Sequence, residues 1–434
     1  MTSPVWHPFT QHGLNEPIPH VKRAEGALLH LADGSTLIDA ISSWWVTTHG
    51  HCHPRIVAAI AAQAGQLDQL IFAGYTHDPA EQVARGLIDL APRAEGQPEL
   101  AHVFYSDSGS TAVEVALKMA LGYWHNLALD GLAPEESRRS RSRILVLEHS
   151  YHGDTIGTMS VGERGVYNAA WSPLLFDVGT IPFPAPGHEQ ACLDALNVAC
   201  AQKPAAFIVE PLILGAGGML LYPPSVLRAM AAICRSHSVL FIADEVMTGW
   251  GRTGTLFACE QAGVVPDIMA VAKGITGGTM PLAATLATAP IFDAHRSTDR
   301  ARLFYHSSSY TANPIACAAA AANLAIWREE DVLGRIASLS HGIAVRLEAL
   351  ARHRAFANPR QIGAIAAIDL IAPDAGYLSD LAPRLRAFFL ERGLLLRPLG
   401  NTIYLMPPYC LDADQLDRLF AALAEAGDFF GVQP

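Results

Sequence analysis

Charged residues are scarce in this sequence, and basic residues are scarcer than acidic ones. Only 16% of the 434 residues are charged, and 30 Lys and Arg stand against 41 Asp and Glu, which gives a formal net charge of −11 at pH 7. Binding to nucleic acid or to an anionic membrane surface requires a basic patch. The composition therefore argues against both kinds of partner and favours small-molecule substrates.

Paired cysteines and long apolar segments are also lacking. The seven Cys are odd in number and include no CxxC pair, so we predict neither a disulfide framework nor a zinc site and expect a reducing cytoplasm. The first residues, MTSPVWHPFTQHGLNEP, show no basic segment followed by an apolar one, so we expect no secretory signal. The longest apolar stretches, 206–222 and 314–327, are interrupted by Glu210-Pro211 or too short to cross a bilayer.

Hydrophobic residues, in contrast, are abundant. They make up 50% of the chain, enough for a large core and about two compact units. Strand-like and helix-like segments alternate between about residues 101 and 289, which predicts a large α/β domain with a mostly parallel sheet. Alternating apolar residues around Asp33-Gly34 predict a hairpin in a smaller domain, which the segment after residue 331 completes.

Two apolar segments typical of buried parallel strands each end at a charged residue. Residues 239–243 (VLFIA) lead into Asp244, and residues 268–272 (IMAVA) lead into Lys273. An unpaired buried ammonium is costly, so such a lysine usually pairs with an acid, loses its proton or is covalently modified.

Each of these charged residues has a plain interpretation and a functional one. Alone, Lys273 would be a strand-end lysine that extends to solvent, and Asp244 would cap a turn. Together, they match the needs of a pyridoxal phosphate enzyme, in which a lysine forms a Schiff base and an aspartate keeps the pyridine nitrogen protonated. The pair favours the functional interpretation.

Small hydroxyl residues precede two predicted helices. Ser108-Gly109-Ser110-Thr111 opens the segment AVEVALKMALGYW, and the free N–H groups of such a helix start suit a phosphate. An ordinary serine N-cap is the alternative. A second cluster, SSSYT from Ser307, precedes the helix that starts at Asn313-Pro314.

Two further side chains stand at positions that suggest binding. Tyr151 follows the strand 144–147 and should emerge at the carboxyl edge of the sheet, where ligands collect in α/β folds, although it could also be a packing tyrosine. Arg397 lies within the apolar pattern GLLLRPLG, where an arginine is costly unless it faces a carboxylate. We predict that Arg397 binds a substrate acid.

The segment ADEVMTGWGRTG followed by PDIMAVAKGITGG resembles the core motif of the class III, or ω-type, pyridoxal phosphate aminotransferases. The resemblance implies fold type I, with a mostly parallel seven-stranded sheet in a large domain and a small α+β domain built from both chain ends. It implies that Lys273 binds the cofactor and moves the substrate proton, that Asp244 holds the pyridine nitrogen and that Tyr151 stacks on the ring. The phosphate contacts fall on Gly109 and Ser110.

In this family the second hydroxyl turn reaches the phosphate of the partner subunit, which implies a homodimer with shared sites. Ser309 stands here for the usual Thr, and Ser307-Ser308 stand where close relatives carry Gly-Pro. We assign Ser308 and Ser309 to the cofactor and Ser307 to the substrate. We expect residues 61–310 to form the cofactor-binding domain and residues 1–60 and 311–434 to form the small domain.

Four further motifs, WHPFTQ, SSWWVTTHGHCHP, YHGDTIGTMSVG and RPLGNTIYLMPPY, resemble the subfamily that converts 8-amino-7-oxononanoate to 7,8-diaminononanoate in biotin biosynthesis. This substrate is a long apolar chain with a distant carboxylate, which needs an aromatic wall and a cation. The resemblance maps the wall onto Trp44 and Tyr151 and the cation onto Arg397, with Tyr404 nearby. Trp45 is interpreted as a packing residue.

The amino donor is the open point of this interpretation. Phe9 stands in WHPFTQ where the better-known S-adenosylmethionine users carry Tyr, so the hydroxyl that would bind substrate is missing. Lysine-using members also exist. We expect S-adenosylmethionine as donor, with lysine as the alternative, and a general ω-amino acid or diamine:pyruvate aminotransferase as the rival function.

Overall fold

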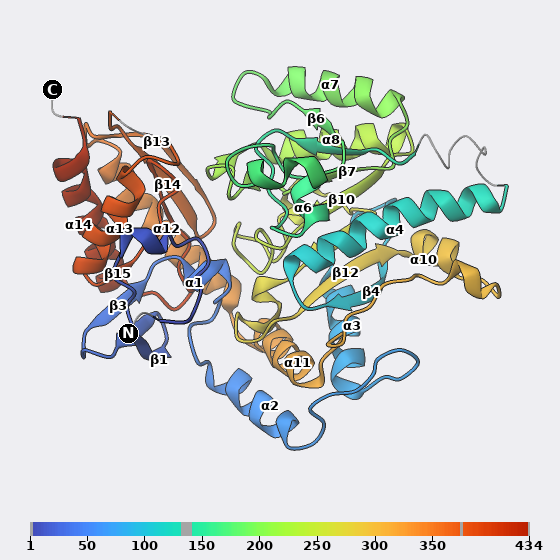
Figure 1. Ribbon diagram of the computed structural model, residues 1–434, viewed down its shortest axis with the longest axis horizontal. Coiled ribbons are helices and arrows are strands. Elements are labelled where there is room, and N and C mark those ends of the chain that lie inside the picture. Colours follow the sequence, from blue (N-terminus) through green and yellow to red (C-terminus); the bar gives the residue numbers. More distant parts are fainter. Residues whose placement is uncertain (1–2, 132–140, 374–375, 433–434) are drawn as a thin grey trace.

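The computed structural model of this chain describes residues 3–131, 141–373 and 376–432. Figure 1 shows a larger body built around one sheet, and beside it a smaller body that contains both ends of the chain. Within the described residues, no helix is long and apolar enough to cross a membrane.

The larger body is organised by a seven-stranded sheet of order β4-β12-β11-β10-β7-β5-β6. Every pairing is parallel except the two made by β12, which runs opposite to its neighbours. This confirms the predicted mostly parallel sheet. The strands are β4 (Leu100–Ser106), β5 (Ile144–Leu147), β6 (Gly179–Ile181), β7 (Ala206–Val209), β10 (Leu240–Asp244), β11 (Ile268–Val271) and β12 (Ala283–Thr288).

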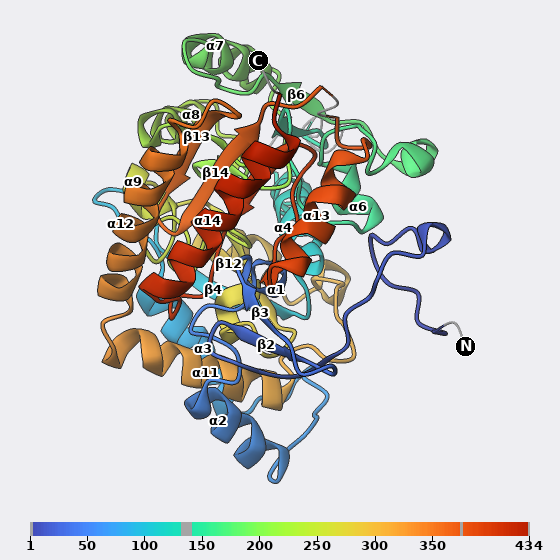
Figure 2. The same cartoon turned by 90° about the vertical axis from the view of Figure 1, so that its left-hand side faces the viewer.

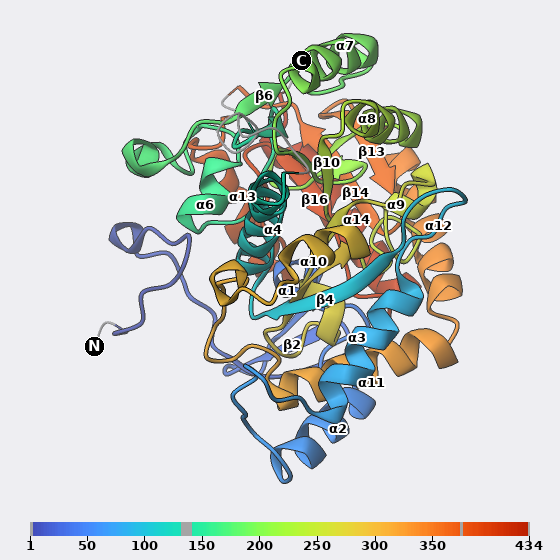
Figure 3. The same ribbon diagram turned by 90° about the vertical axis from the view of Figure 1, so that its right-hand side faces the viewer.

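Helices cover both faces of this sheet, which explains why its strands are continuous apolar runs. Ile242 of β10 packs with Val113 of α4 on one face, and its neighbour Phe241 packs with Leu227 of α8 on the other. Helices α4 and α10 both contact β12 and β4, and Figure 3 shows the two helices beside β4. The covering helices are α3 (Asp78–Leu90), α4 (Gly109–Leu129), α7 (Glu189–Ala201), α8 (Pro224–Ser236), α10 (Ala289–His295) and α11 (Pro314–Glu329).

The smaller body joins the two ends of the chain through main-chain hydrogen bonds. Strand β3 (Thr36–Asp39) is the second strand of the predicted hairpin and also pairs in parallel with β15 (Leu394–Leu395). The domain boundaries after residues 60 and 310 stay a prediction. Figure 2 shows this body from its helical side. Its other elements are β1 (Val21–Glu25), β2 (Leu28–Leu31), β13 (Phe356–Ile362), β14 (Ile365–Leu370), β16 (Thr402–Leu405), α12 (Val332–Leu350), α13 (Leu381–Glu391) and α14 (Ala413–Phe430).

Short elements connect these layers. They are η1 (His12–Leu14), α1 (Ser42–Trp45), α2 (Pro54–Ala64), α6 (Ile156–Ser160), η2 (Ala169–Leu174), β8 (Ile213–Leu214), β9 (Leu220–Leu221), α9 (Cys259–Ala262), η3 (Lys273–Thr276) and η4 (Arg300–Arg302). The carboxyl ends of β5, β7, β10 and β11 point to one edge of the sheet, and the loops that follow them face the smaller body.

Candidate active site

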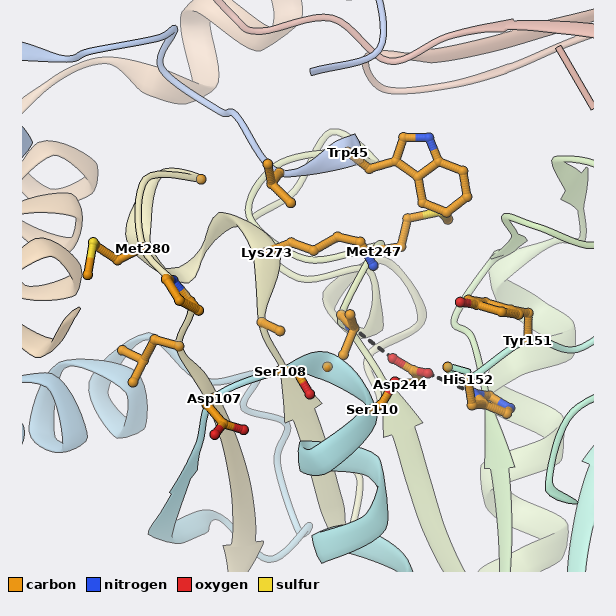
Figure 4. Close-up of a pocket in the computed structure, with 18 of the residues that line it drawn as sticks. Trp45, Asp107, Ser108, Ser110, Tyr151, His152, Asp244, Met247, Lys273 and Met280 are labelled. Carbon is orange, nitrogen blue, oxygen red and sulfur yellow. Dashed lines mark hydrogen bonds and ion pairs between the residues drawn. The ribbon is translucent and has the colours of Figure 1, made fainter. Parts of the chain in front are cut away.

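A cavity of about 400 Å³ lies at this edge of the sheet, and we call it the sheet-edge pocket. Figure 4 shows the side chains that line it. Five of the residues predicted from the sequence meet there, namely Gly109, Ser110, Tyr151, Asp244 and Lys273. The structure therefore brings together residues that lie up to 164 positions apart, from Gly109 to Lys273.

Lys273 is the second residue after β11 and opens the turn η3 in the left-handed region, with φ of 45°. Its amine extends into the pocket, with Nζ 5.6 Å from the centroid of the Trp45 ring. Among the described residues it forms no hydrogen bond or ion pair. Burial lowers the pKa of the Lys273 amine, and the charges of Asp244 and Glu210 oppose this only in part.

Asp244 ends β10 below the lysine and pairs with a histidine that the sequence analysis overlooked. Its Oδ2 lies 2.6 Å from Nδ1 of His152, and the N–H of Val246 donates to its Oδ1 at 3.0 Å. Burial alone would lower the pKa of His152, but the hydrogen bond with Asp244 and its charge raise that pKa above the usual value. His152 and Asp244 thus form a buried hydrogen-bonded pair at the end of β10.

Tyr151 is fixed by a second buried acid that the sequence did not assign to the site. Glu210, at the end of β7, accepts hydrogen bonds from the N–H of Tyr151 and from that of Gly215, each at 3.0 Å. Burial raises the pKa of Glu210 to about 7. The Tyr151 hydroxyl donates to Asp154 at 3.0 Å, which orients its ring along the pocket.

The start of α4 forms the anion-binding wall of the pocket. Ser108 caps this helix by a reciprocal pair of hydrogen bonds with Thr111, at 3.2 and 3.0 Å. The cap leaves the N–H groups of Gly109 and Ser110 directed to the pocket end of the helix. A Cβ at Gly153 would lie 2.1 Å from Ser110 Oγ. Only glycine at this position therefore allows the loop after β5 to approach the start of α4.

These features fit pyridoxal phosphate. An amine without a partner, an aspartate paired with a histidine, an aromatic ring and a helix start share one cavity of about 400 Å³. The amine suits the aldehyde of the cofactor, and the aspartate suits its pyridine nitrogen. The aromatic ring suits the face of the pyridine, and the helix start suits the phosphate.

Three predicted substrate residues form a separate group beside the pocket, which we call the arginine group. Arg397 Nη2 donates to the backbone oxygen of Phe9 at 2.9 Å. Its guanidinium carbon lies 5.2 Å from the Trp44 ring centroid and 5.8 Å from that of Phe9. None of the three lines the sheet-edge pocket. The place of Trp44 in the aromatic wall along the substrate chain stays a prediction.

Trp45, the next residue in the chain, lies in the sheet-edge pocket. It is 6% exposed and lines the pocket, and its indole N–H donates to the Tyr404 hydroxyl at 2.9 Å. Trp45 is buried, as expected of a packing residue, and it also lines the pocket. The hydrogen bond from the indole connects Tyr404 to the lining of the pocket.

Ser307, Ser308 and Ser309 do not line the sheet-edge pocket of their own chain. Their turn is held by Gln69, whose amide donates to the Ser309 backbone oxygen and accepts from Asn313 Nδ2 at 3.1 Å. The Ser308 hydroxyl is buried without a hydrogen bond among the described residues.

Comparison with known proteins places this geometry in a family. The family model for class III aminotransferases matches residues 10–426. The chain belongs to the class III aminotransferases. Two curated relatives, both named adenosylmethionine-8-amino-7-oxononanoate aminotransferase, are 47% identical in Synechococcus elongatus (98% of each chain) and 36% identical in Geobacter sulfurreducens (97% of this chain and 95% of the relative).

Solved structures agree with this assignment. The enzyme of the same name from Methanocaldococcus jannaschii superposes with a TM-score of 0.90 at 32% identity, over 99% of this chain and 98% of that one. An amine transaminase from an uncultivated Pseudomonas species, solved with pyridoxal phosphate bound, also gives a TM-score of 0.90, at 31% identity over 99% and 100% of the chains. The predicted enzyme class is confirmed.

The lowered pKa of Lys273 predicts a pH-dependent stability of this aminotransferase without cofactor. Between the lowered pKa and the ordinary value of about 10.4, the unfolded chain holds a proton that the folded chain has released, so stability rises with pH. We expect Lys273→Met to raise the thermal midpoint at neutral pH, and the gain to shrink as the pH approaches about 10.4. Thermal unfolding across this range measures it. A variant less stable than the wild type at every pH would show that the amine is well paired in the folded state.

Proposed function

We propose that this aminotransferase uses pyridoxal phosphate to transfer an amino group to the ketone of 8-amino-7-oxononanoate, giving 7,8-diaminononanoate. The observation that carries the proposal is the single cavity shared by the Lys273 amine, the Asp244–His152 pair and the start of α4. The substrate is supported by the arginine group beside that cavity and by the names of the full-length relatives.

Each pocket residue has a defined task in this reaction. The bound cofactor supplies the electron sink for the reacting carbon. Asp244, held by His152, would accept a hydrogen bond from the pyridine nitrogen, and the N–H groups of Gly109 and Ser110 would hold the phosphate.

Lys273 moves the proton. Its amine takes the proton from the amine-bearing carbon of the donor and later delivers one to the carbon that was the ketone of the acceptor. Burial lowers its pKa, which makes the neutral, basic form more accessible near neutral pH. Trp45, Met247 and the loop around Gly278 enclose the amine and exclude water from this step.

Arg397 is proposed to bind the far carboxylate of the keto substrate. We expect Arg397→Met to lower kcat/KM for 8-amino-7-oxononanoate by about a hundredfold, the usual loss when one side of a buried charge pair is removed. The cofactor lies at the other end of the substrate, so its affinity should not change. Steady-state kinetics and a cofactor titration measure the two effects. Arg354→Met, at an exposed position, is the matched control. Equal kcat/KM values in both variants would refute the assignment.

The amino donor is tested directly. The purified protein, loaded with pyridoxal phosphate, is given 8-amino-7-oxononanoate with either S-adenosylmethionine or lysine, and 7,8-diaminononanoate is measured by mass spectrometry. We propose S-adenosylmethionine as the donor, because two curated relatives carry it in their names. Product with lysine alone would reverse this choice. Rapid turnover of β-alanine with pyruvate, without 7,8-diaminononanoate, would replace the proposed function by the general ω-amino acid reaction.

We further propose a homodimer in which Ser308 and Ser309 complete the phosphate site of the partner, with Ser307 beside its substrate. The support is a turn that Gln69 holds away from its own pocket, flanked by apolar side chains that are more than half exposed. These are Ile71 (66%), Tyr75 (62%), Tyr305 (66%) and Tyr310 (61%). An apolar surface of this kind usually marks an interface.

Mixed dimers test the sharing of sites. Lys273→Ala lacks the amine, and Ser309→Ala lacks the hydroxyl that we assign to the partner's phosphate, so each alone should be poorly active at limiting cofactor. A dimer of one chain of each has one site with Lys273 from one chain and Ser309 from the other. We therefore expect activity to rise when the two variants are unfolded, mixed and refolded together. Activity equal to the mean of the separate variants would contradict shared sites.

A further inference from the structure

The turn that carries the two tryptophans has a strained backbone. Three of its four residues, none of them glycine, lie at positive φ, with values of 52° at Ser42, 59° at Ser43 and 66° at Trp45. Ser43 has a ψ of −96°, close to the rare γ-turn conformation. Each such residue costs about 1–3 kcal/mol, and the conformation persists only where its surroundings impose it.

This conformation sends two adjacent side chains to two different places. Trp44 is 42% exposed and packs at 5.5 Å from Phe9, within the arginine group. Trp45 is 6% exposed and turns into the sheet-edge pocket above the Lys273 amine. The turn thus supplies one aromatic ring to the reacting end of the substrate and one to its carboxylate end.

Asp39 is the residue that imposes this conformation. Its side chain is fully buried at the end of β3 and accepts hydrogen bonds from the N–H of Ser43 at 2.6 Å and from that of Ile41 at 3.2 Å. The imidazole of His51 lies 2.8 Å from its Oδ2 and provides a third partner. The carboxylate therefore binds the most strained residue of the turn directly.

Two further bonds hold the turn against the rest of the protein. The Ser42 hydroxyl donates to the Met406 backbone oxygen at 2.7 Å, and Arg252 donates to the backbone oxygen of Trp45 at 3.3 Å. These bonds fix where the turn lies. Only the Asp39 carboxylate, among these groups, reaches the N–H of Ser43.

We propose that Asp39 is a positioning residue for substrate selection, which acts by holding the strained turn so that Trp44 and Trp45 face the two ends of the keto acid. This inference rests on the proposed function. It predicts that loss of the carboxylate misplaces both rings while the cofactor end of the site, built on the large sheet, stays intact.

The test uses the full-length, cofactor-loaded protein labelled with 5-fluorotryptophan, which gives one ¹⁹F resonance for each of its seven tryptophans. Trp44→Phe and Trp45→Phe assign the two resonances of interest. We expect Asp39→Asn to shift or broaden these two and to leave the resonance of Trp124, which is anchored to the Ala205 backbone oxygen, unchanged. We also expect KM for the keto acid to rise about tenfold, as the loss of one buried hydrogen bond would cause, with a smaller change in kcat.

Two variants make the test specific. Asp33→Asn is the matched control, because Asp33 also binds a nearby backbone N–H, that of Ser35 at 2.9 Å, but is exposed and remote from the turn. Ser43→Gly in the Asp39→Asn background should restore both the resonances and KM, because glycine adopts positive φ without strain. The Ser43 side chain is exposed, so its removal breaks no packing.

Unchanged Trp44 and Trp45 resonances in Asp39→Asn would overturn the proposal, as would shifts that Ser43→Gly fails to reverse. If Asp39→Asn does not fold, His51→Gln removes one of the three hydrogen bonds and is judged by the same two resonances. The ¹⁹F readout needs no substrate. A response of both resonances in a protein that does not aminate 8-amino-7-oxononanoate would therefore refute the proposed function and leave the role of Asp39 standing.

Discussion

Replacing Lys273 with alanine is expected to lower kcat by at least about a thousandfold, because one amine serves as both covalent anchor and proton carrier. The pocket offers no substitute. Among the described residues that line it, the other ionisable side chains are acids, the His152 that is paired with Asp244, and Tyr151, whose pKa burial raises well above the usual range. Single-turnover kinetics with the donor amine measure the loss.

The same variant should still bind the cofactor, because the Asp244–His152 pair and the start of α4 remain. Borohydride treatment followed by intact-mass measurement distinguishes the two states. We expect the wild type to retain the cofactor covalently and Lys273→Ala to release it on denaturation. Lys22→Ala, at an exposed position on β1, should behave as the wild type. Retention of most of the activity by Lys273→Ala would remove Lys273 from the mechanism.

The sequence alone predicted the parts of this site that depend on strand ends. An apolar run that stops at a charged residue indicates both the strand and the residue at its carboxyl end. Asp244 and Lys273 could therefore be paired from the sequence alone. The same reasoning located Tyr151, and the hydroxyl-rich start of α4 located Gly109 and Ser110. These are local signals, and each lies within about ten residues of sequence.

The residues that were missed depend on contacts between distant segments. His152 and Asp244 are 92 residues apart, and nothing in the motif YHGDT says which side chain the histidine meets. Glu210 was noted as a break in an apolar stretch, and its partner is a backbone N–H 59 residues away. The role of Glu210 therefore could not be derived from the residues next to it in the sequence.

The different surroundings of Trp44 and Trp45 could not be predicted for another reason. Side-chain alternation predicts which of two adjacent residues faces the core only where φ and ψ are regular. Positive φ at Ser42, Ser43 and Trp45 breaks that regularity, and serine and tryptophan give no warning of it. The strained backbone of this turn is therefore the feature of the site that the residue pattern predicted least well.

Asp244→Asn is expected to lower kcat by about a hundredfold or more, because a neutral amide cannot stabilise a positive charge on the pyridine nitrogen. The amide keeps the shape of the side chain and can still accept the hydrogen bond from Val246. The loss therefore reports charge and not packing. It is measured as kcat for the half-reaction with the donor amine at saturating cofactor.

The buried histidine provides a second, independent measurement on this variant. In the wild type the charge of Asp244 raises the pKa of His152 against the effect of burial. A raised pKa gives stability that is complete below the ordinary value of about 6.5 and is lost as the pH rises through the folded-state pKa.

Asp244→Asn removes this contribution, so its destabilisation should be largest in acid and decline toward alkaline pH. Titration of the imidazole by NMR should show His152 losing its proton at a lower pH than in the wild type. His152→Gln, which keeps the Asp244 charge, should lose less activity than Asp244→Asn. The opposite order would mean that the histidine, and not the aspartate, carries the charge on which the site depends.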